Sequence, residues 1–220
     1  LQEIAEDLPL DNEIILQNIA ITAMTGKGAE ANKESLAKLI VKAIKGVAEL
    51  KEGKLIVNLD DIKVEKRVGD GADESELIEG IVLDKERAHA QMPQLIQDAK
   101  VALLDVSLEI KNTEIDAKIQ ITNPEQLNSF LAQEERSLRE MVEKVKDSGA
   151  TVLFCQKGID DIAQHFLAKA GILAARRVKK SDLEKLARAT GAKIISDWKD
   201  LSSNDLGYAG VVREEKIADE

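Results

Sequence analysis

The chain has 220 residues, of which 33% are charged, and its 31 basic and 41 acidic side chains give a formal net charge of −10. Phosphate binding needs a concentrated positive surface, so this charge disfavours a nucleic-acid partner. No apolar run approaches the roughly 20 residues of a membrane-spanning helix, and the first residues, LQEIAEDLPL, are too acidic for a signal peptide. We therefore expect a cytoplasmic protein without a membrane partner.

The first predicted elements are two helices. Asp11, after Pro9, is predicted to cap a helix with apolar residues at three- and four-residue spacing. A glycine-flanked turn, residues 25–28, ends this helix, and a second amphipathic helix is predicted to run on to Gly53. Together they predict a helical hairpin, which the strand-like residues 54–68 extend into a small α+β layer.

A linker and an alternating pattern follow. The segment GDGADESE, residues 69–76, combines glycine with acidic side chains and is typical of an exposed linker, so we place a domain boundary near it. A helix is predicted over residues 159–170, with an apolar stripe of Ile159, Ile162, Ala163, Phe166 and Leu167. A second helix is predicted from a capping box of Ser181 and Glu184 to Gly191. Short apolar runs predict strands over residues 78–83, 101–106, 151–155, 172–175 and 193–196. The alternation of strand and helix predicts an α/β fold with a layered sheet.

Residues 107–148 interrupt this alternation and are too long for an ordinary loop, which favours a functional excursion. Residues 107–122 alternate weakly, and Pro124 opens a long helix predicted to run to about Ser148. The second half of this helix has a continuous apolar stripe that can pack on the α/β body. The first half extends past that body and carries a separate cluster of Leu127, Phe130 and Leu131. Two interpretations stay open, because either the inserted strands or a partner can cover this cluster.

Other polar and small side chains also have two interpretations. The helix over 159–170 has a polar face that is either a recognition surface or a solvated face, made of Asp160, Asp161, Gln164, His165 and Lys169. Lys27, on a glycine-flanked turn, can contact a polyphosphate or be a solvated linker residue. Cys155 lies in an apolar run and is predicted to be a small buried side chain, and His89 and His165 show no metal-ligand spacing.

In order, these segments resemble the central part of a group II chaperonin subunit, the family of archaeal thermosomes and the eukaryotic cytosolic chaperonin. The resemblance covers essentially the whole chain. It is carried by TGKGAE (25–30), ELIEGIVLDKE (76–86), MPQLIQDAKVALLD (92–105), FLAQEERSLREMV (130–142), QKGIDDIAQHFLAKAGILAARRVKKSDLEKLARATGA (156–192) and DLGYA (205–209). The abundance of Lys, Glu and Ile with few aromatic residues is also typical of thermophilic proteins.

The resemblance implies a first intermediate-domain segment, residues 1–67, and an apical domain, residues 68–220, with a helical protrusion at about 108–138. In this family the protrusion is a built-in lid segment that is available to unfolded clients in the open ring; the matching lid residues are Ile115, Ile119, Leu127, Phe130 and Leu131. The client-binding helix matches 159–170, with candidate contacts Asp160, Asp161, Gln164, His165, Phe166 and Lys169. The nucleotide-sensing loop, which approaches the terminal phosphate of ATP, matches Thr25, Gly26 and Lys27.

The resemblance also implies that part of the machinery lies elsewhere. The equatorial domain and the catalytic aspartate of the family have no counterpart here, so we expect a fragment that is not an enzyme and binds no cofactor alone, with ATP and Mg²⁺ held elsewhere in the parent complex. The expected partners are unfolded polypeptides and neighbouring subunits of a double ring. The alternative is a nucleotide-binding α/β enzyme that uses Lys27 or Gly69–Gly71, and micromolar ATP binding in calorimetry would favour it.

Overall fold

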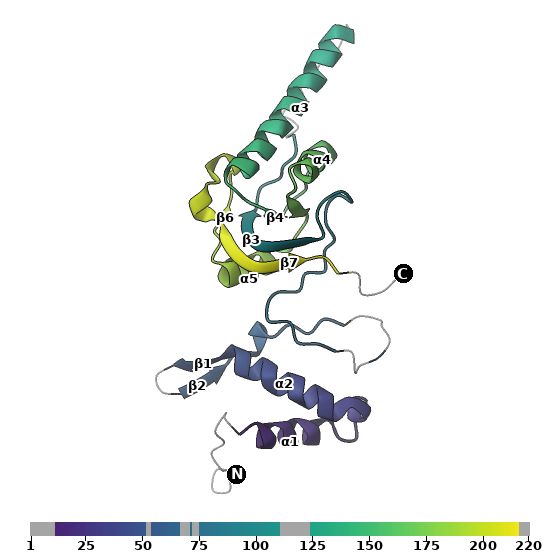
Figure 1. The fold of residues 1–220 in the computed structure, drawn as a ribbon, viewed down its shortest axis with the longest axis vertical. Coiled ribbons are helices and arrows are strands. Elements are labelled where there is room, and N and C mark those ends of the chain that lie inside the picture. The colour runs from purple at the N-terminus through teal and green to yellow at the C-terminus, as the bar shows by residue number, and fades with distance from the viewer. Residues whose placement is uncertain (1–11, 52–53, 67–70, 72–74, 111–123, 216–220) are drawn as a thin grey trace. The chain divides into compact units, whose positions relative to one another are not determined.

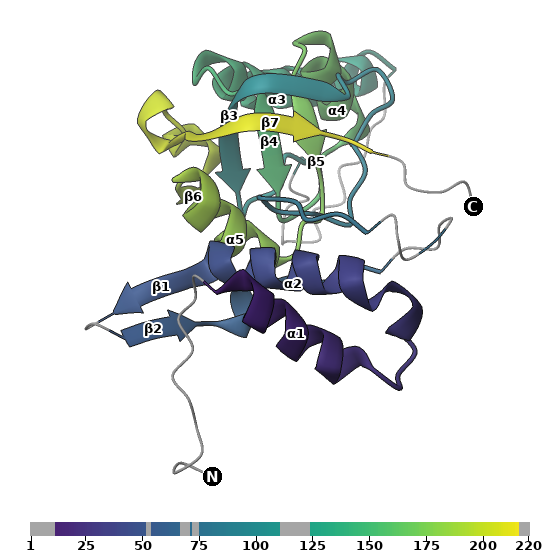
Figure 2. The same cartoon turned by 60° about the horizontal axis from the view of Figure 1, so that its bottom comes forward.

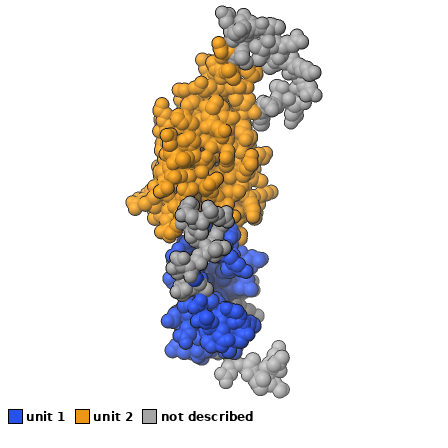
Figure 3. All heavy atoms as spheres, turned by 90° about the vertical axis from the view of Figure 1, so that its right-hand side faces the viewer, with its two compact units in different colours: residues 1–82, 216–220 blue, residues 83–215 orange. Residues whose placement is uncertain are grey.

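The structure, a computed structural model, describes residues 12–51, 54–66, 71, 75–110 and 124–215. The chain divides into two compact units, one made by Leu1–Val82 with Lys216–Glu220 and one by Leu83–Glu215 (Figure 1, Figure 3). This division lies after Val82, whereas the predicted boundary lies after residue 67. The assignment of the two parts to intermediate and apical domains stays a prediction.

The first unit contains the predicted helical hairpin, formed by α1, Glu13–Met24, and α2, Lys33–Val47 (Figure 2). The N-cap of α1 is Asn12 rather than the predicted Asp11, because the Asn12 side chain accepts a hydrogen bond from the Ile15 amide at 3.3 Å. Between the helices, Glu30–Asn32 forms a 3₁₀ turn. The prediction of two successive helices is therefore confirmed, with a different first cap.

The two helices differ in what they bury. α2 is amphipathic and buries Ala37 and Val41, whereas none of the residues of α1 is buried. The ammonium group of Lys45 on α2 contacts the carboxylate of Glu13 on α1 at 2.5 Å, which links the end of one helix to the start of the other. The hairpin therefore combines a thin apolar contact with surface ion pairing.

A small antiparallel hairpin follows α2. β1, Ala48–Lys51, pairs with β2, Lys54–Val57, and Ala48 lies opposite Val57. The helix predicted to continue to Gly53 is thus too long, because strand pairing satisfies the backbone groups of 48–51 in another way. A 3₁₀ turn, Leu59–Asp61, comes next. The strand predicted over 78–83 is wrong, since those residues have no strand conformation.

The second unit is built on a five-stranded sheet in the order β5-β4-β3-β6, with β7 paired to β3. Strands β3 to β6 run parallel to their neighbours, and β7 runs antiparallel to β3. The strands are β3 (Leu95–Leu104), β4 (Val152–Cys155), β5 (Leu173–Ala175), β6 (Ile194–Ile195) and β7 (Gly207–Arg213). The parallel βαβ arrangement confirms the predicted α/β class. β7 was not predicted, because its segment GYAGVVR contains two glycines and shows no apolar alternation.

Helices cover the sheet on both faces (Figure 1). α3, Pro124–Asp147, and α4, Asp161–Lys169, pack on one face, and α5, Lys180–Thr190, lies on the other. Alternate side chains of one strand point to opposite faces, so Leu104 belongs to the core under α3 and α4 while its neighbour Leu103 is buried on the α5 side. The parallel part of the sheet, formed by β4, β5 and the second half of β3, is therefore buried on both faces, whereas β7 is largely exposed.

The predicted start of α5 is wrong and its predicted end is confirmed. Its N-cap is Lys179, without a side-chain hydrogen bond, so Ser181 and Glu184 lie within the helix and form no capping box at its start. The Val178 amide donates to the Cys155 carbonyl at 3.0 Å, which anchors the chain just before the helix. Gly191 ends the helix with φ 75°, the left-handed conformation that glycine adopts without strain.

α3 has the two-part pattern that its sequence predicts. Leu138, Val142 and Val145 in its second half are buried in the core of the second unit, and the first half extends beyond the body of this unit (Figure 1). No helix in the described part of the chain is long and apolar enough to span a membrane. The inserted strands predicted over 108–121 lie mostly outside the described residues, although Leu108 forms a parallel bridge with Ile159.

Candidate functional site

The start of α4 is held by Asp160 and by Leu108 in the segment after β3. The Asp160 carboxylate accepts a hydrogen bond from the Ile162 amide at 2.9 Å and caps the helix. The Asp160 amide donates to the Leu108 carbonyl at 2.9 Å. Asp160, predicted as a client contact, therefore has a structural role at the helix start.

Gln164 departs from the predicted pattern of α4. It is buried, with 3% of its surface exposed, and its amide group donates to the Ile159 carbonyl at 2.6 Å and to the Asp161 carboxylate at 3.0 Å. Ile162, predicted in the buried stripe, is 46% exposed instead. The helix buries Ala163, Gln164, Leu167 and Ala168, so its buried face is rotated relative to the prediction because the internal hydrogen bonds of Gln164 make its burial tolerable.

The exposed face of α4 combines charged and apolar side chains. Asp161, His165 and Lys169 are exposed, as predicted for a polar face, and Phe166 is half-buried. Asp161 lies 3.7 Å from the guanidinium of Arg176, which follows β5. The exposed surface therefore places Ile162 and the Phe166 ring among charges of both signs.

An aromatic cluster joins α4 to two other segments. The guanidinium carbon of Arg139 on α3 lies 4.9 Å from the centre of the Phe166 ring. The His165 ring lies 6.1 Å from the Phe166 ring, and the His89 ring lies 5.9 Å from that of His165 in an edge-on arrangement. The Gln91 amide donates to Nδ1 of His89 at 3.2 Å, which leaves the proton of the neutral ring on its Nε2 atom. The cluster therefore joins α4 to α3 and to the segment before β3.

Two members of this cluster, Arg139 and His89, were not predicted to lie near α4. Arg139 and His89 reach α4 only through the packing of α3 and of the segment before β3, and residue spacing carries no signal for either contact. In the described residues, no group of three or more histidine, cysteine, aspartate or glutamate side chains is suited to hold a metal ion.

The first half of α3 exposes apolar side chains. Phe130 is 39% exposed and Leu131 is 53% exposed. Ile115, Ile119 and the side chain of Leu127, the other predicted lid residues, lie outside the described part of the structure. Phe130 and Leu131 therefore carry what the structure shows of this predicted cluster.

The turn with Lys27 is held by local hydrogen bonds. Gly26 has φ 74°, and its amide donates to the Glu30 carboxylate at 3.1 Å. The Thr25 hydroxyl donates to the Ile21 carbonyl at 2.8 Å, and the Lys27 amide donates to the Met24 carbonyl at 3.2 Å. The Lys27 side chain is exposed, so its ammonium group can contact an anion from outside the unit. Gly69 and Asp70 of the alternative phosphate loop lie outside the described residues.

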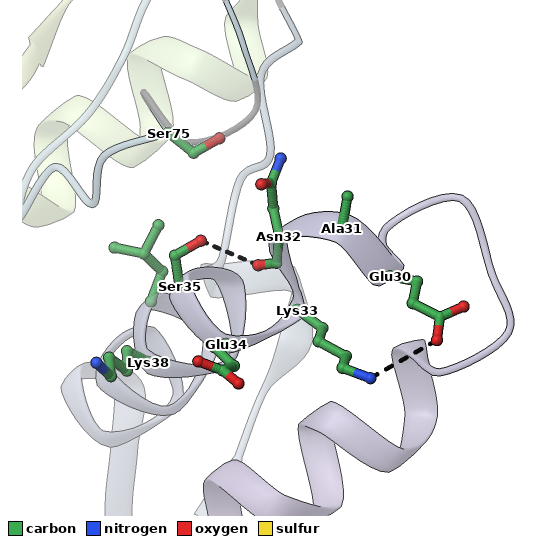
Figure 4. Close-up of a pocket in the computed structure, with 9 residues that line it drawn as sticks. Glu30, Ala31, Asn32, Lys33, Glu34, Ser35, Lys38 and Ser75 are labelled. Carbon is green, nitrogen blue, oxygen red and sulfur yellow. Dashed lines mark hydrogen bonds and ion pairs between the residues drawn. The ribbon is translucent and has the colours of Figure 1, made fainter.

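A shallow hollow of about 690 Å³ lies beside this turn, at the start of α2 (Figure 4). Its lining carries charges of both signs, and Lys33 is paired with Glu30 at 3.7 Å. The lining residues are Glu30–Ser35, Lys38, Leu39 and Ser75, without Thr25, Gly26 or Lys27. The balanced charges give the hollow no preference for an anion.

Comparison with known proteins places this architecture among chaperonins. A model of the TCP-1/cpn60 chaperonin family matches residues 1–220. A thermosome subunit of Methanopyrus kandleri is 56% identical over 218 residues, and the thermosome subunit beta of Archaeoglobus fulgidus is 57% identical over 220 residues. These alignments cover 99% and 100% of this chain but 40% of each relative.

A solved structure agrees with these sequence relatives. The open-state monomer of a group II chaperonin from Methanococcoides burtonii superimposes with a TM-score of 0.77 at 45% sequence identity. The match covers 99% of this chain and 48% of that one. The chain therefore spans about two-fifths to one-half of the length of these proteins.

Proposed function

Because the chain belongs to the TCP-1/cpn60 chaperonin family, we propose that it is the part of a chaperonin subunit that binds unfolded proteins and supplies a segment of the built-in lid. The proposal rests on one observation above all: large apolar side chains are exposed on α3 and α4 of the second unit. Phe130, Leu131 and Ile162 are each at least 39% exposed. Burying such a side chain fully is worth about 1.5–3 kcal/mol, so an unfolded chain that covers them gains affinity.

On α4, Ile162 and Phe166 are the proposed apolar contacts for a client. Asp161, His165 and Lys169 surround them as polar contacts that orient a client without a large desolvation cost. Gln164 is left out of this set because it is buried, and Asp160 acts through the helix cap. The protrusion at about 108–138 is proposed to meet the protrusions of neighbouring subunits in a double ring when the lid closes.

The turn at Thr25, Gly26 and Lys27 is proposed to sense nucleotide from outside. The Gly26 amide is occupied by Glu30, so the described turn offers one exposed ammonium group rather than a phosphate cradle. This donor set fits a single contact with a phosphate and not the binding of a whole nucleotide. ATP and Mg²⁺ would be held elsewhere in the full-length subunit, and the ATPase activity and the cytoplasmic location belong to the same proposal.

The proposal is tested by measuring whether the isolated chain, without ATP, suppresses the aggregation of chemically denatured citrate synthase. We expect suppression by the unchanged chain and a roughly three- to tenfold loss of client affinity for Phe130→Asp, because an aspartate removes apolar contact and adds a buried charge. Val211→Asp is the matched control, since Val211 is 57% exposed and belongs to β7 and to neither helix. Circular dichroism would confirm that each variant folds.

Two outcomes would contradict the proposal. If the unchanged chain does not suppress aggregation, the exposed apolar residues do not capture unfolded protein. If Phe130→Asp and Val211→Asp lose affinity equally, capture depends on general surface hydrophobicity and not on the protrusion.

A further inference from the structure

The Phe166 ring on α4 is covered on one face by a cation. The guanidinium carbon of Arg139 lies 4.9 Å from the ring centre, within the range of a cation–π interaction. Phe166 is half-buried and belongs to the edge of the core below α3 and α4. The part of the ring that faces outward is therefore shared between solvent and Arg139.

Two contacts position Arg139, one at its guanidinium and one at its backbone. Its guanidinium contacts the Glu135 carboxylate, one helical turn earlier, at 3.1 Å. Its backbone follows Leu138, which is 1% exposed and anchors this turn of α3 on the sheet. The side chain itself is 56% exposed, so it can swing away without opening the core. Arg139 is thus positioned by a weak surface ion pair and not by burial.

We propose that Arg139 is a residue that sets client selectivity by covering the Phe166 ring and competing with apolar client segments for it. This inference rests on the proposed client-binding function of α4. A client segment that contacts the Phe166 ring must first displace the Arg139 guanidinium. This requirement lowers the affinity for weakly apolar segments more than for segments with a large apolar surface. The energy of an exposed cation–π contact predicts an effect of about two- to fivefold on affinity, or about 0.5–1 kcal/mol at 1.4 kcal/mol per tenfold.

The direction of this effect is unusual for a residue in a binding surface. Removal of the Arg139 side chain is expected to tighten client binding, because the client then contacts the Phe166 ring without displacing a guanidinium. Arg139→Lys keeps the charge but loses the planar group that stacks on the ring, so it should give part of the effect. Glu135→Gln releases the guanidinium from its ion pair and should change affinity in the same direction by a smaller factor.

The test measures binding of the isolated chain to fluorescein-labelled, reduced and carboxyamidomethylated α-lactalbumin by fluorescence anisotropy. We expect Arg139→Gln to bind this unfolded protein about two- to fivefold more tightly than the unchanged chain does. Arg136→Gln is the matched control, because it makes the same charge change three residues away. Arg136 is exposed and, within the described residues, makes no ring contact.

A spectroscopic readout separates a covering role from a purely structural one. In NMR spectra, the Phe166 ring should shift the resonances of the Arg139 δ-methylene protons upfield, because they lie over the ring. Phe166→Leu should abolish this shift. Addition of unlabelled client should return the resonances toward their unstacked positions. If the client binds without moving them, Arg139 does not cover the client site and the inference is wrong.

The affinity outcomes distinguish the two proposals. If the unchanged chain binds the client and Arg139→Gln binds it equally or more weakly than Arg136→Gln does, the inference about Arg139 fails and the proposed function stands. If neither the unchanged chain nor any folded variant binds the client, the proposed function fails, and the inference falls with it.

Discussion

Cys155, at the end of β4, is a thiol that folding removes from water. It is completely buried, and its Sγ atom lies 3.2 Å from the Val106 carbonyl oxygen, to which it can donate. Burial raises the pKa of this thiol from 9.0 to about 11. The thiolate is the reactive form of cysteine, so the native side chain resists alkylation at neutral pH. Its predicted role as a small buried side chain is confirmed.

This raised pKa predicts a loss of stability in alkali. Between pH 9 and 11 the unfolded chain has released the thiol proton while the native chain retains it, so the free energy of unfolding falls as pH rises. The total loss is on the order of 2–3 kcal/mol, at 1.36 kcal/mol per unit of pKa. Urea unfolding of the unchanged chain and of Cys155→Val at several pH values measures it. Parallel curves for the two proteins across this range would contradict the prediction.

The environments of two single residues could not be predicted from the sequence. Asn12 replaces Asp11 as the first helix cap, because both residue types cap helices and only the path of the chain selects one. Gln164 is a polar residue that can be buried because its amide group donates hydrogen bonds to two acceptors. Neither outcome follows from residue type alone.

At the scale of elements, the contact between β7 and the end of α5 depends on one glycine. A Cβ atom at Gly207 would lie 2.6 Å from the Ala192 amide nitrogen and 2.7 Å from the Thr190 carbonyl oxygen. Both are backbone atoms, so a side chain could be admitted only by moving the strand away from the helix end. The sheet edge formed by β7 therefore requires glycine here.

Gly207→Ala is accordingly expected to destabilise the second unit by about 1–3 kcal/mol, as overpacking does. Gly210→Ala on the same strand is the control, because a Cβ atom there meets nothing within 4 Å. Thermal unfolding followed by circular dichroism compares the two variants. Equal melting temperatures would show that the strand moves at little cost.

α3 and α4 show how much of an element its pattern specifies. The bounds and the two-part apolar pattern of α3 follow from Pro124 and from the spacing of its apolar residues, and the structure confirms them. The rotation of α4 does not follow from its pattern, because Ile162 and Gln164 exchange the environments predicted for them. For a short helix that packs against both a sheet and a second helix, these two neighbours decide which of its faces is buried.

At the scale of the whole molecule, the two units differ in how much they bury. Among the described residues up to Val82, the buried hydrophobic side chains are Ala37 and Val41, whereas the second unit has a large continuous core. Hydrophobic burial is the main stabilising term in folding, so the first unit is expected to be the less stable one.

Hydrogen exchange measures this difference. We expect amides of α2 to exchange at least tenfold faster than those of β3 and β4, because local opening of the first unit requires less free energy. Hydrogen exchange measured at increasing urea concentrations should show the first unit unfolding at a lower urea concentration than the second unit. Equal protection in both units, with a single transition, would show that they unfold together.

By itself, the sequence determined the elements that depend on local patterns: the helical hairpin, the parallel strands with their connecting helices, and the divided helix α3. It also carried the family motifs, because those are runs of consecutive residues. The tertiary structure alone decided the hairpin after Val47, the addition of β7 to the sheet, and the contact of Arg139 and His89 with α4. These features join residues far apart in the chain, and their energy comes from packing and pairing that residue spacing does not encode.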